Sequence, residues 1–448
     1  MSWTDHVIWW HVYPLGAVGA PIHGGFDPAV VDHPLTRLDG WLDHAIALGA
    51  NGLQLGPIFA SATHGYDTLD HYRIDPRLGE DADLDELVRR AHDKGLRVLL
   101  DGVFNHVAWS HPLYQQALVD GPDSAAARHF RIDWSSGEAR PEVFEGHGSL
   151  VALDHGRPEV VDLVADVMRH WLRRGIDGWR LDAAYAVDPH FWARVLPQVR
   201  SEFPEATFVG EVIHGDYAHV VRESTLDSVT QYELWKAIWS SLLDRNFWEL
   251  DHALRRHQGL LDTFVPMTFV GNHDVTRIAS RVGQAKAVLA MTVLMTVAGQ
   301  PSLYYGDEHG FEGVKEDREG GDDAVRPPLP QAPSGLSPLG RGPFGCTRRS
   351  SPYGVGILGW CAGRSRPWSS PTSGWCMPCD PRRAPRSTGT PRRCSTSSWT
   401  SLPSRAWRSV RATSLSSPTL PRPAAGRRVH LRDVSRRTRP LPAGSVEG

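Results

Sequence analysis

Short apolar segments alternate with longer amphipathic ones from Val7 to Glu308, and this alternation constrains the fold of the chain more than any other feature. Apolar runs bounded by Gly or Pro are typical of strands, and apolar residues that recur every three or four positions are typical of helices. Two of the predicted helices cover residues 83–94 and 159–173. Regular alternation of this kind predicts a parallel sheet covered by helices.

Eight strands are predicted in this region. They fall near residues 7–13, 52–59, 97–104, 178–182, 207–212, 228–232, 267–271 and 301–305. Eight such strand and helix units are typical of a (β/α)8 TIM barrel, in which the active site lies at the carboxyl ends of the strands. We therefore expect an α/β fold of this class, with its site at that end.

One connection is too long for a simple loop. About fifty residues separate the third predicted strand from the next helix, and a segment of that length usually has structure or function of its own. We predict a small inserted subdomain, subdomain B, at residues 107–157. The barrel would then consist of residues 1–106, with the first three strands, and residues 158–335, with the other five.

The residues after about 340 differ in composition from the rest. Residues 341–448 contain 20 Arg and no Lys against 3 Asp and Glu, and they hold all five cysteines, Cys376 and Cys379 among them. Such an Arg-, Pro- and Ser-rich segment cannot bury enough apolar surface to offset its chain entropy. Three interpretations are a shifted reading frame, a disordered tail and a nucleic-acid-binding arm. The missing lysines and five scattered tryptophans argue against a nucleic-acid partner.

Three further features of the sequence indicate the cellular compartment that we expect for the protein. The first ten residues, MSWTDHVIWW, lack the cationic start and apolar stretch of a secretion signal. The longest apolar segment, residues 285–298, contains Lys286 and is too short to span a bilayer. Residues 1–340 contain no cysteine and cannot form a disulfide scaffold. We expect a cytoplasmic protein without a membrane partner.

Charged and polar side chains follow four of the predicted strands. Arg180 and Asp182 end the fourth strand two residues apart, so both side chains point to one face. A carboxylate beside a guanidinium stays ionised, as a carboxylate nucleophile must. A single Asp after a strand is more often a helix cap. The full set is Asp101, Asn105, His106, Arg180, Asp182, Glu211, His273 and Asp274.

The order of these motifs resembles glycoside hydrolase family 13, the α-amylase family, over about residues 5–335. The matching segments are DGVFNH at 101–106, GWRLD at 178–182, GEV at 210–212, NHD at 272–274, HGYDTLDHYRIDPRLG at 64–79 and GQPSLYYGDE at 299–308. The resemblance implies a TIM barrel that acts on the α-glucosidic bonds of an α-glucan or oligosaccharide substrate.

The resemblance also implies a role for each residue. Retaining cleavage of a glycosidic bond uses two carboxyl groups about 5–5.5 Å apart. Asp182 is then the nucleophile, Glu211 the general acid/base and Asp274 the transition-state stabiliser. The implied substrate-binding residues are Tyr66, His106, Arg180 and His273, with Asp101 as a support for Arg180. Calcium takes oxygen ligands, and Asn105 is the one candidate calcium ligand.

The sequence departs from the family pattern in two places, and these departures affect the activity and the fold that we expect. Tyr185 and Ala186 stand where many α-amylases have Lys-His, which disfavours an endo-acting starch amylase. The family's eighth helix and its all-β C-terminal domain are not recognisable in this sequence. Because the eighth helix would cover the first and eighth strands, we expect these two strands to have exposed apolar flanks.

Several functions remain open. We expect a retaining hydrolase of maltooligosaccharides or related α-glucans. The alternatives are a glucanotransferase of the same family and a non-catalytic, truncated or frameshifted product with an incomplete barrel. A protein that only binds sugar is less favoured, because binding alone gives no reason to keep a nucleophile and an acid together.

Overall fold

The computed structural model describes residues 2–318, 320–340 and 345, so the predictions for the basic tail and its cysteines lie outside the described residues. All described residues belong to one compact unit, Met1–Ser369. None of their helices is long and apolar enough to cross a membrane.

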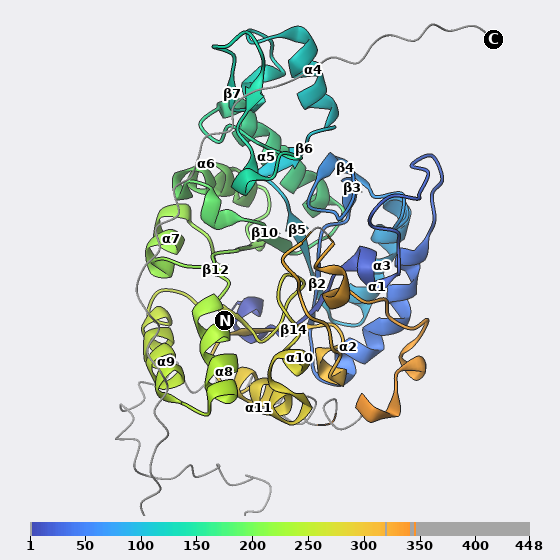
Figure 1. The fold of residues 1–448 in the computed structure, drawn as a ribbon, viewed down its shortest axis with the longest axis vertical. Helices are drawn as coiled ribbons and strands as arrows, with labels where there is room; N and C mark the ends of the chain where they lie inside the picture. Colours follow the sequence, from blue (N-terminus) through green and yellow to red (C-terminus); the bar gives the residue numbers. More distant parts are fainter. Residues whose placement is uncertain (1, 319, 341–344, 346–448) are drawn as a thin grey trace, which may run out of the picture. The chain divides into compact units, whose positions relative to one another are not determined.

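Eight parallel strands form the barrel (Figure 1). In chain order they are β1 (Trp9–Val12), β2 (Gly52–Leu55), β5 (Arg97–Gly102), β10 (Gly178–Leu181), β11 (Thr207–Gly210), β12 (Ser228–Val229), β13 (Met267–Phe269) and β14 (Gln300–Tyr304). The sheet order is β12-β11-β10-β5-β2-β1-β14-β13. A parallel bridge between Thr230 and Met267 joins its two edges and closes the barrel. All eight predicted strands and the TIM barrel are confirmed.

Helices surround the strands (Figure 1). They are α2 (Leu42–Leu48), α3 (Asp81–Asp93), α5 (Pro158–Arg173), α6 (Pro189–Arg200), α7 (Tyr217–Ser224), α8 (Tyr232–Asp244), α9 (Trp248–Leu260), α10 (Ile278–Val282) and α11 (Gln284–Leu294), with the short α1 (Pro14–Ala17) after β1. The predicted helices at 83–94 and 159–173 correspond to α3 and α5. Local signals fix their starts: Glu80 and Asp83 form a capping box at α3, and Pro158 opens α5.

Successive side chains of each strand point alternately into and out of the barrel, so the protein has an inner core and an outer core. Trp9, Leu99, Val209 and Met267, from alternate strands, form an apolar cluster inside the barrel. Two residues further along three of these strands stand His11, Asp101 and Glu211, which alternation places on the same inner face. The barrel interior therefore changes from apolar to charged towards the carboxyl ends of the strands.

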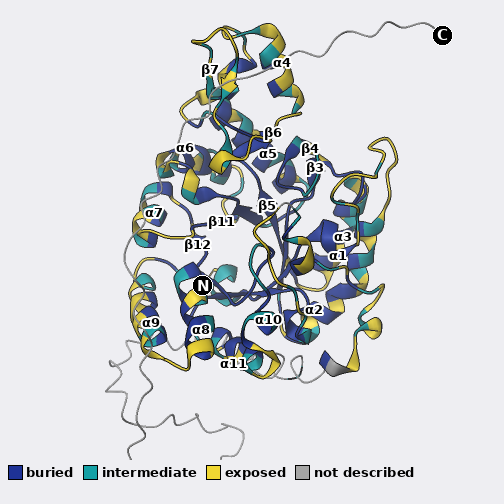
Figure 2. Cartoon of the chain, in the orientation of Figure 1, coloured by how far each residue is buried: buried dark blue, intermediate teal, exposed yellow. Residues whose placement is uncertain are grey.

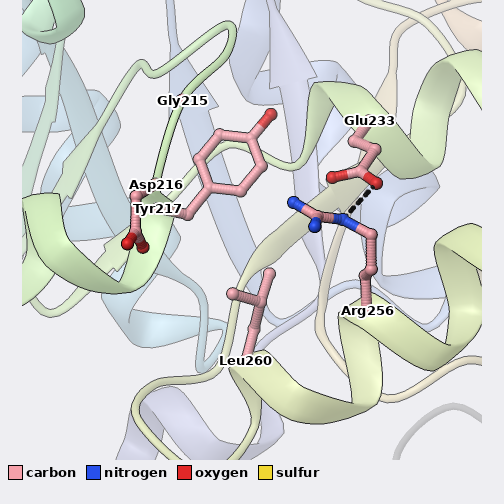
Figure 3. Close-up of a pocket in the computed structure, with 6 residues that line it drawn as sticks. All are labelled: Gly215, Asp216, Tyr217, Glu233, Arg256 and Leu260. Atoms are coloured by element: carbon pink, nitrogen blue, oxygen red, sulfur yellow. Dashed lines mark hydrogen bonds and ion pairs between the residues drawn. The ribbon is translucent and has the colours of Figure 1, made fainter.

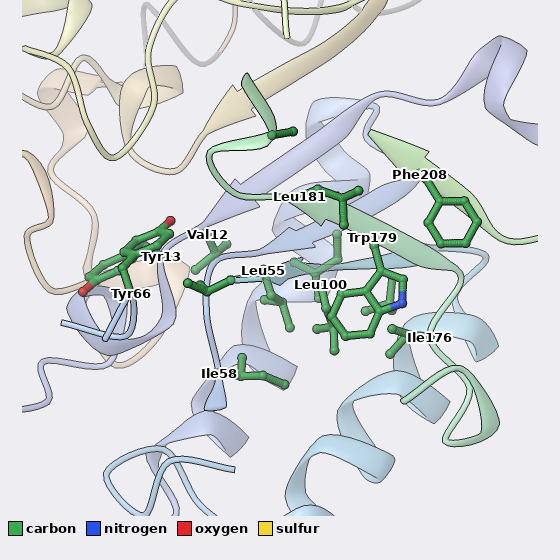
Figure 4. Close-up of a cluster of buried hydrophobic side chains, with 14 of the residues drawn as sticks. Val12, Tyr13, Leu55, Ile58, Tyr66, Leu100, Ile176, Trp179, Leu181 and Phe208 are labelled. Atoms are coloured by element: carbon green, nitrogen blue, oxygen red, sulfur yellow. The ribbon is translucent and has the colours of Figure 1, made fainter. Parts of the chain in front are cut away.

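The outer core lies between the strands and the helices. Figure 4 shows the outward-pointing side chains Val12, Leu55, Leu100, Trp179, Leu181 and Phe208. Each is at most 1% exposed, and full burial of such a side chain contributes about 1.5–3 kcal/mol. Figure 2 shows that the strands are buried, whereas the helices have exposed residues on the sides that face away from the strands. This packing holds the strand ends, and hence the charged groups, in a fixed arrangement.

The long connection between β5 and α5 has its own structure. It contains β6 (His106–Ala108), α4 (Pro112–Asp120), β7 (Ile132–Asp133), β8 (Arg140–Pro141), the 3-10 turn η4 (Phe144–Gly146) and β9 (Leu150–Ala152). The pairs β6 and β9, and β7 and β8, are antiparallel. A further antiparallel pair after β2 consists of β3 (Phe59–Ser61) and β4 (Thr68–Ile74).

The segment after β14 contains no α-helix within the described residues up to 340. It forms the 3-10 turns η6 (Asp307–His309), η7 (Asp323–Val325), η8 (Pro333–Gly335) and η9 (Pro338–Gly340). The prediction of exposed flanks on the first and eighth strands is nevertheless wrong. Trp10 and Leu303 are at most 1% exposed, and Trp41 stacks on Trp10 with ring centroids 6.1 Å apart.

Candidate active site

Arg180, near the end of β10, joins three of the predicted acids. Its Nη1 is 2.8 Å from both carboxylate oxygens of Asp101 and 2.9 Å from Asp182 Oδ1. Its Nη2 is 2.8 Å from Glu211 Oε1. The Arg180 side chain is only 4% exposed, so these contacts lie away from bulk water. One buried cation therefore neutralises part of the charge of three buried acids.

Burial raises the pKa of each of these three acids. Burial is the largest cause, and the attraction of Arg180 opposes it only partly. The pKa of Asp101 rises to about 7 and that of Asp182 to about 6, and the pKa of Glu211 also rises. The cluster therefore holds protons close to neutral pH, as a site that combines an acid with an ionised nucleophile requires.

Hydrogen bonds fix the orientation of the Glu211 carboxyl. The backbone N–H of Ala183 donates to Oε2 at 3.0 Å, and the Tyr232 hydroxyl donates to Oε1 at 3.0 Å. Asn272 Nδ2 donates to the Tyr232 oxygen at 2.9 Å, which leaves the hydroxyl proton for Glu211. Ala183 adopts a left-handed conformation, with φ 46° and ψ 34°, that residues with a Cβ rarely adopt. The backbone after Asp182 is thus strained where its N–H meets Glu211.

Asp274 follows β13 and differs from the other acids. Burial alone would raise its pKa, but His273 and Arg326 outweigh burial and lower it. His273 Nε2 is 2.9 Å from Asp274 Oδ2, and Arg326 Nη2 is 3.0 Å from Oδ1. The Asp274 side chain is 32% exposed, so an ionised carboxylate reaches the solvent-facing side of the cluster.

Tyr66 and His273 are in contact, as the sequence predicted for two residues of one site. The Tyr66 hydroxyl donates to Asp101 Oδ2 at 3.0 Å and also contacts His273 Nε2. Their rings stack with centroids 5.1 Å apart, and Tyr13 stacks on His273 at 5.9 Å. Tyr66 thereby connects Asp101 with His273.

His106 joins this group through the backbone of Tyr66. Its Nε2 is 2.9 Å from the Tyr66 carbonyl oxygen, and Asn105 Nδ2 is 3.1 Å from its Nδ1. The ring is therefore protonated at Nε2, and burial lowers its pKa to about 4. Phe144 of the inserted segment stacks on His106 with centroids 4.7 Å apart. All the predicted site residues consequently lie in one connected network.

Asn105, the one candidate calcium ligand, has a side-chain partner within the protein. Its side chain is buried and donates to His106, and calcium takes six to eight oxygen ligands. Among residues 2–318 and 320–340, no group of three or more His, Cys, Asp or Glu is arranged to hold a metal ion. A calcium ion bound by the Asn105 oxygen stays a prediction.

Three residues of the network were missed by the sequence analysis: Tyr232, Asn272 and Arg326. Asn272 stands inside the NHD motif, and Tyr232 is the last residue of the sixth predicted strand, so the position of both residues in the sequence was a usable signal. Arg326 lies in the segment after β14. Its Nε donates to the His273 carbonyl at 3.0 Å, and its guanidinium lies 4.6 Å from the ring centroid of Tyr13.

A surface pocket of about 400 Å³ lies apart from this network, between α7, α8 and α9 (Figure 3). Glu233 and Arg256 in its lining pair at 2.6 Å, and Asp216 accepts a hydrogen bond from the N–H of His219. These charged groups are already partnered, and none of the acids around Arg180 lines the pocket. The Arg180 network is therefore the better candidate for chemistry.

Known proteins resemble this chain in sequence. The catalytic-domain model "Alpha amylase, catalytic domain" matches residues 39–332. A cyclomaltodextrinase from Geobacillus thermopakistaniensis is 32% identical over 345 residues, which cover 70% of this chain and 57% of that protein. An intracellular maltogenic amylase from Bacillus subtilis is 30% identical over 339 residues, with the same coverages. The chain thus spans less than two thirds of the length of these relatives.

Solved structures share the fold. Cyclic alpha-maltosyl-(1-->6)-maltose hydrolase from Arthrobacter globiformis superposes with a TM-score of 0.68 at 24% identity, over 78% of this chain and 82% of that one. Ttha1563 from Thermus thermophilus superposes with a TM-score of 0.67 at 26% identity, over 79% and 82%. With the sequence match over most of the barrel, these findings show that the chain belongs to the α-amylase family, glycoside hydrolase family 13.

Proposed function

We propose that this chain is a retaining glycoside hydrolase that cleaves α-glucosidic bonds of maltooligosaccharides or related α-glucans. The observation that carries the proposal is that one guanidinium, that of Arg180, binds both Asp182 and Glu211 at the carboxyl ends of adjacent strands. Membership of the α-amylase family and the names of the relatives, cyclomaltodextrinase and maltogenic amylase, support the substrate class.

The reaction proceeds in two steps. In the first, a carboxylate oxygen of Asp182 attacks the anomeric carbon, the bond to the leaving oxygen breaks, and Glu211 gives its proton to that oxygen. In the second, ionised Glu211 takes a proton from water, whose oxygen attacks the same carbon and releases Asp182. Arg180 contacts the carboxyl groups of both Asp182 and Glu211. Its positive charge favours ionised Asp182 before the attack and ionised Glu211 after the proton has been transferred.

The neighbouring residues bind the sugar. Asp274, held ionised by His273 and Arg326, accepts hydrogen bonds from sugar hydroxyls and stabilises the positive charge of the oxocarbenium-like transition state. Tyr66, His106 and His273 form the remaining wall of the sugar site. Asp101 does not react; it positions Arg180 through two 2.8 Å contacts.

The proposal extends to organisation and location. We assign residues 107–157 to a subdomain inserted between the barrel segments 1–106 and 158–335, and the β6 and β9 pairing near its two ends supports this division. A cytoplasmic location is supported by the relative named intracellular maltogenic amylase.

Incubation of the full chain with maltotriose tests the proposed function. We expect release of reducing sugar, and proton NMR of the earliest product should show the α-anomer of the newly formed chain end, because two successive displacements retain configuration. Asp182→Asn is the matched inactive control. First appearance of the β-anomer, or no release from maltotriose or a cyclomaltodextrin, would contradict the proposal.

The pH dependence of kcat/KM follows from the raised pKa values. Asp182 attacks only when ionised, so kcat/KM should fall as pH decreases through about 6, the raised pKa of Asp182. On the alkaline side kcat/KM should fall again as Glu211 loses the proton it must donate. Initial rates on maltotriose at low substrate, from pH 4 to 9, measure both limbs. A profile that stays flat down to pH 4 would show that the nucleophile has an ordinary pKa.

A further inference from the structure

Tyr232 and Asn272 meet where the barrel closes. Tyr232 begins α8, shortly after β12, and Asn272 follows β13. The bridge between Thr230 and Met267 holds these two strands side by side. The ring of Phe269 in β13 packs edge-on against the ring of Tyr232, with centroids 4.8 Å apart. The closure of the barrel therefore fixes the position of the Tyr232 ring.

The side-chain amide of Asn272 is held in one orientation. Its Oδ1 accepts a hydrogen bond from the backbone N–H of Asp274 at 2.9 Å. Its Nδ2 consequently points to the Tyr232 oxygen, 2.9 Å away, and donates to it. The hydroxyl of Tyr232 then gives its own proton to Glu211 Oε1 at 3.0 Å. Burial raises the pKa of Tyr232 well above its ordinary value, so the hydroxyl keeps its proton and remains a donor.

The two oxygens of the Glu211 carboxyl group have different neighbours. Oε1 faces the Tyr232 hydroxyl and Arg180 Nη2, which is 2.8 Å away. Of the groups in the described part of the chain, only the backbone N–H of Ala183 donates to Oε2. A carboxyl oxygen has about two lone-pair sites, so a proton on Oε1 would displace one of its two donors. Oε2 has a site left for a proton.

We propose that Tyr232 is a positioning residue that keeps the reactive proton of Glu211 on Oε2, and that Asn272 acts through Tyr232. This inference rests on the proposed function, in which Glu211 gives that proton to the leaving oxygen. After the transfer, the Tyr232 hydroxyl remains bonded to Oε1 and stabilises the ionised carboxylate, which then takes a proton from water. Tyr232 itself gives up no proton in either step.

The charge around Glu211 sets the pKa that Tyr232 modifies. Burial raises this pKa, the Arg180 cation lowers it, and neighbouring carboxylates raise it. A hydrogen bond donated to the ionised carboxylate lowers it as well. Removing the Tyr232 hydroxyl should therefore raise the pKa of Glu211 further. The titratable and charged groups that face Glu211 are Asp101, Arg180, Asp182, Tyr185, Tyr232 and Asp274.

Tyr232→Phe removes the hydroxyl and keeps the ring. The alkaline fall of kcat/KM on maltotriose reports the loss of the Glu211 proton, and it should lie about one pH unit higher than in wild type, the size of one hydrogen bond to a charged group. At pH 7, kcat/KM on maltotriose should fall about tenfold, because the acid is less well oriented. On α-maltosyl fluoride, whose leaving group needs little help from an acid, kcat/KM should stay within about twofold of wild type.

Tyr217→Phe is the matched control. The Tyr217 hydroxyl is also part of a buried residue, but it donates to the carbonyl oxygen of Ile213 and not to Glu211. This variant loses a hydrogen bond of the fold, and its alkaline fall should coincide with that of wild type. A fall of Tyr232→Phe at the wild-type pH, or equal losses of that variant on the two substrates, would overturn the positioning role.

Asn272→Leu tests whether Asn272 acts through Tyr232. The bond from Asn272 strengthens the Tyr232 hydroxyl as a donor, so its loss should move the alkaline fall to higher pH by less than Tyr232→Phe does. In the Tyr232→Phe background it should move the fall no further. Equal shifts in both backgrounds, or no shift in either, would contradict this part. If wild type cleaves neither substrate, the proposed function fails; if it cleaves both and neither variant moves the fall, only the positioning role fails.

Discussion

Glu211→Gln should lower kcat on maltotriose by about 10²- to 10⁴-fold, the usual contribution of general acid catalysis. Gln cannot protonate the leaving oxygen, although it keeps the shape of Glu and an oxygen that accepts the hydrogen bonds of Ala183 or Tyr232. Fluoride departs with little help from an acid. The variant should therefore still attack α-maltosyl fluoride through Asp182, and the ester should accumulate because no base activates water.

Mass spectrometry of the intact variant and of its peptides measures that ester. We expect one added maltosyl group on the peptide that contains Asp182. Asp182→Asn should be inactive on both substrates and should acquire no maltosyl group. Glu233→Gln, at a surface ion pair with Arg256, is the matched control and should keep wild-type rates. A maltosyl group on another residue, or equal losses on maltotriose and on the fluoride, would exclude Asp182 and Glu211 from these roles.

The parts of the site that follow from local periodicity were predictable from the sequence. Arg180 and Asp182 share a face because strand side chains alternate, and Glu211 was recognisable as an acid directly after an apolar run. The eight strands were found as short apolar runs bounded by Gly or Pro. The carboxyl ends of parallel strands meet at one end of a barrel, so finding the strands also located the site.

Other parts depend on contacts that no local pattern encodes. Arg326 binds Asp274 from 52 residues further along the chain, and its own neighbourhood contains no motif. Glu145 reaches Tyr185 only because the inserted segment turns back through β9 to the barrel. The burial of Trp10 likewise depends on Trp41, which belongs to a different segment. Each of these contacts joins segments that lie far apart in the sequence.

Arg180→Met should be the most destabilising substitution in the network. It removes the cation shared by Asp101, Asp182 and Glu211 but nearly keeps the side-chain volume. Removing one partner of a buried ion pair costs about 3–5 kcal/mol, because the remaining charge is left uncompensated. The urea midpoint of the full chain at pH 8 measures this loss. Arg173→Met, at an exposed ion pair with Glu202, should leave the midpoint nearly unchanged.

The loss of folding stability caused by Arg180→Met should depend on pH. The ionisation of Asp101, Asp182 and Glu211 determines whether this loss grows or shrinks as pH rises. Their pKa values are already raised in the folded wild-type chain, and without Arg180 they rise further, so the folded state binds more protons than the unfolded state. Folded stability then decreases as pH rises above the ordinary carboxyl pKa near 4. The variant should therefore lie closer to wild type at pH 5 than at pH 8, and adding Asp101→Asn should restore part of the midpoint at pH 8. An equal loss at both pH values would mean that Arg180 stabilises the fold by packing, and that its charge does not control the ionisation of Asp182 and Glu211.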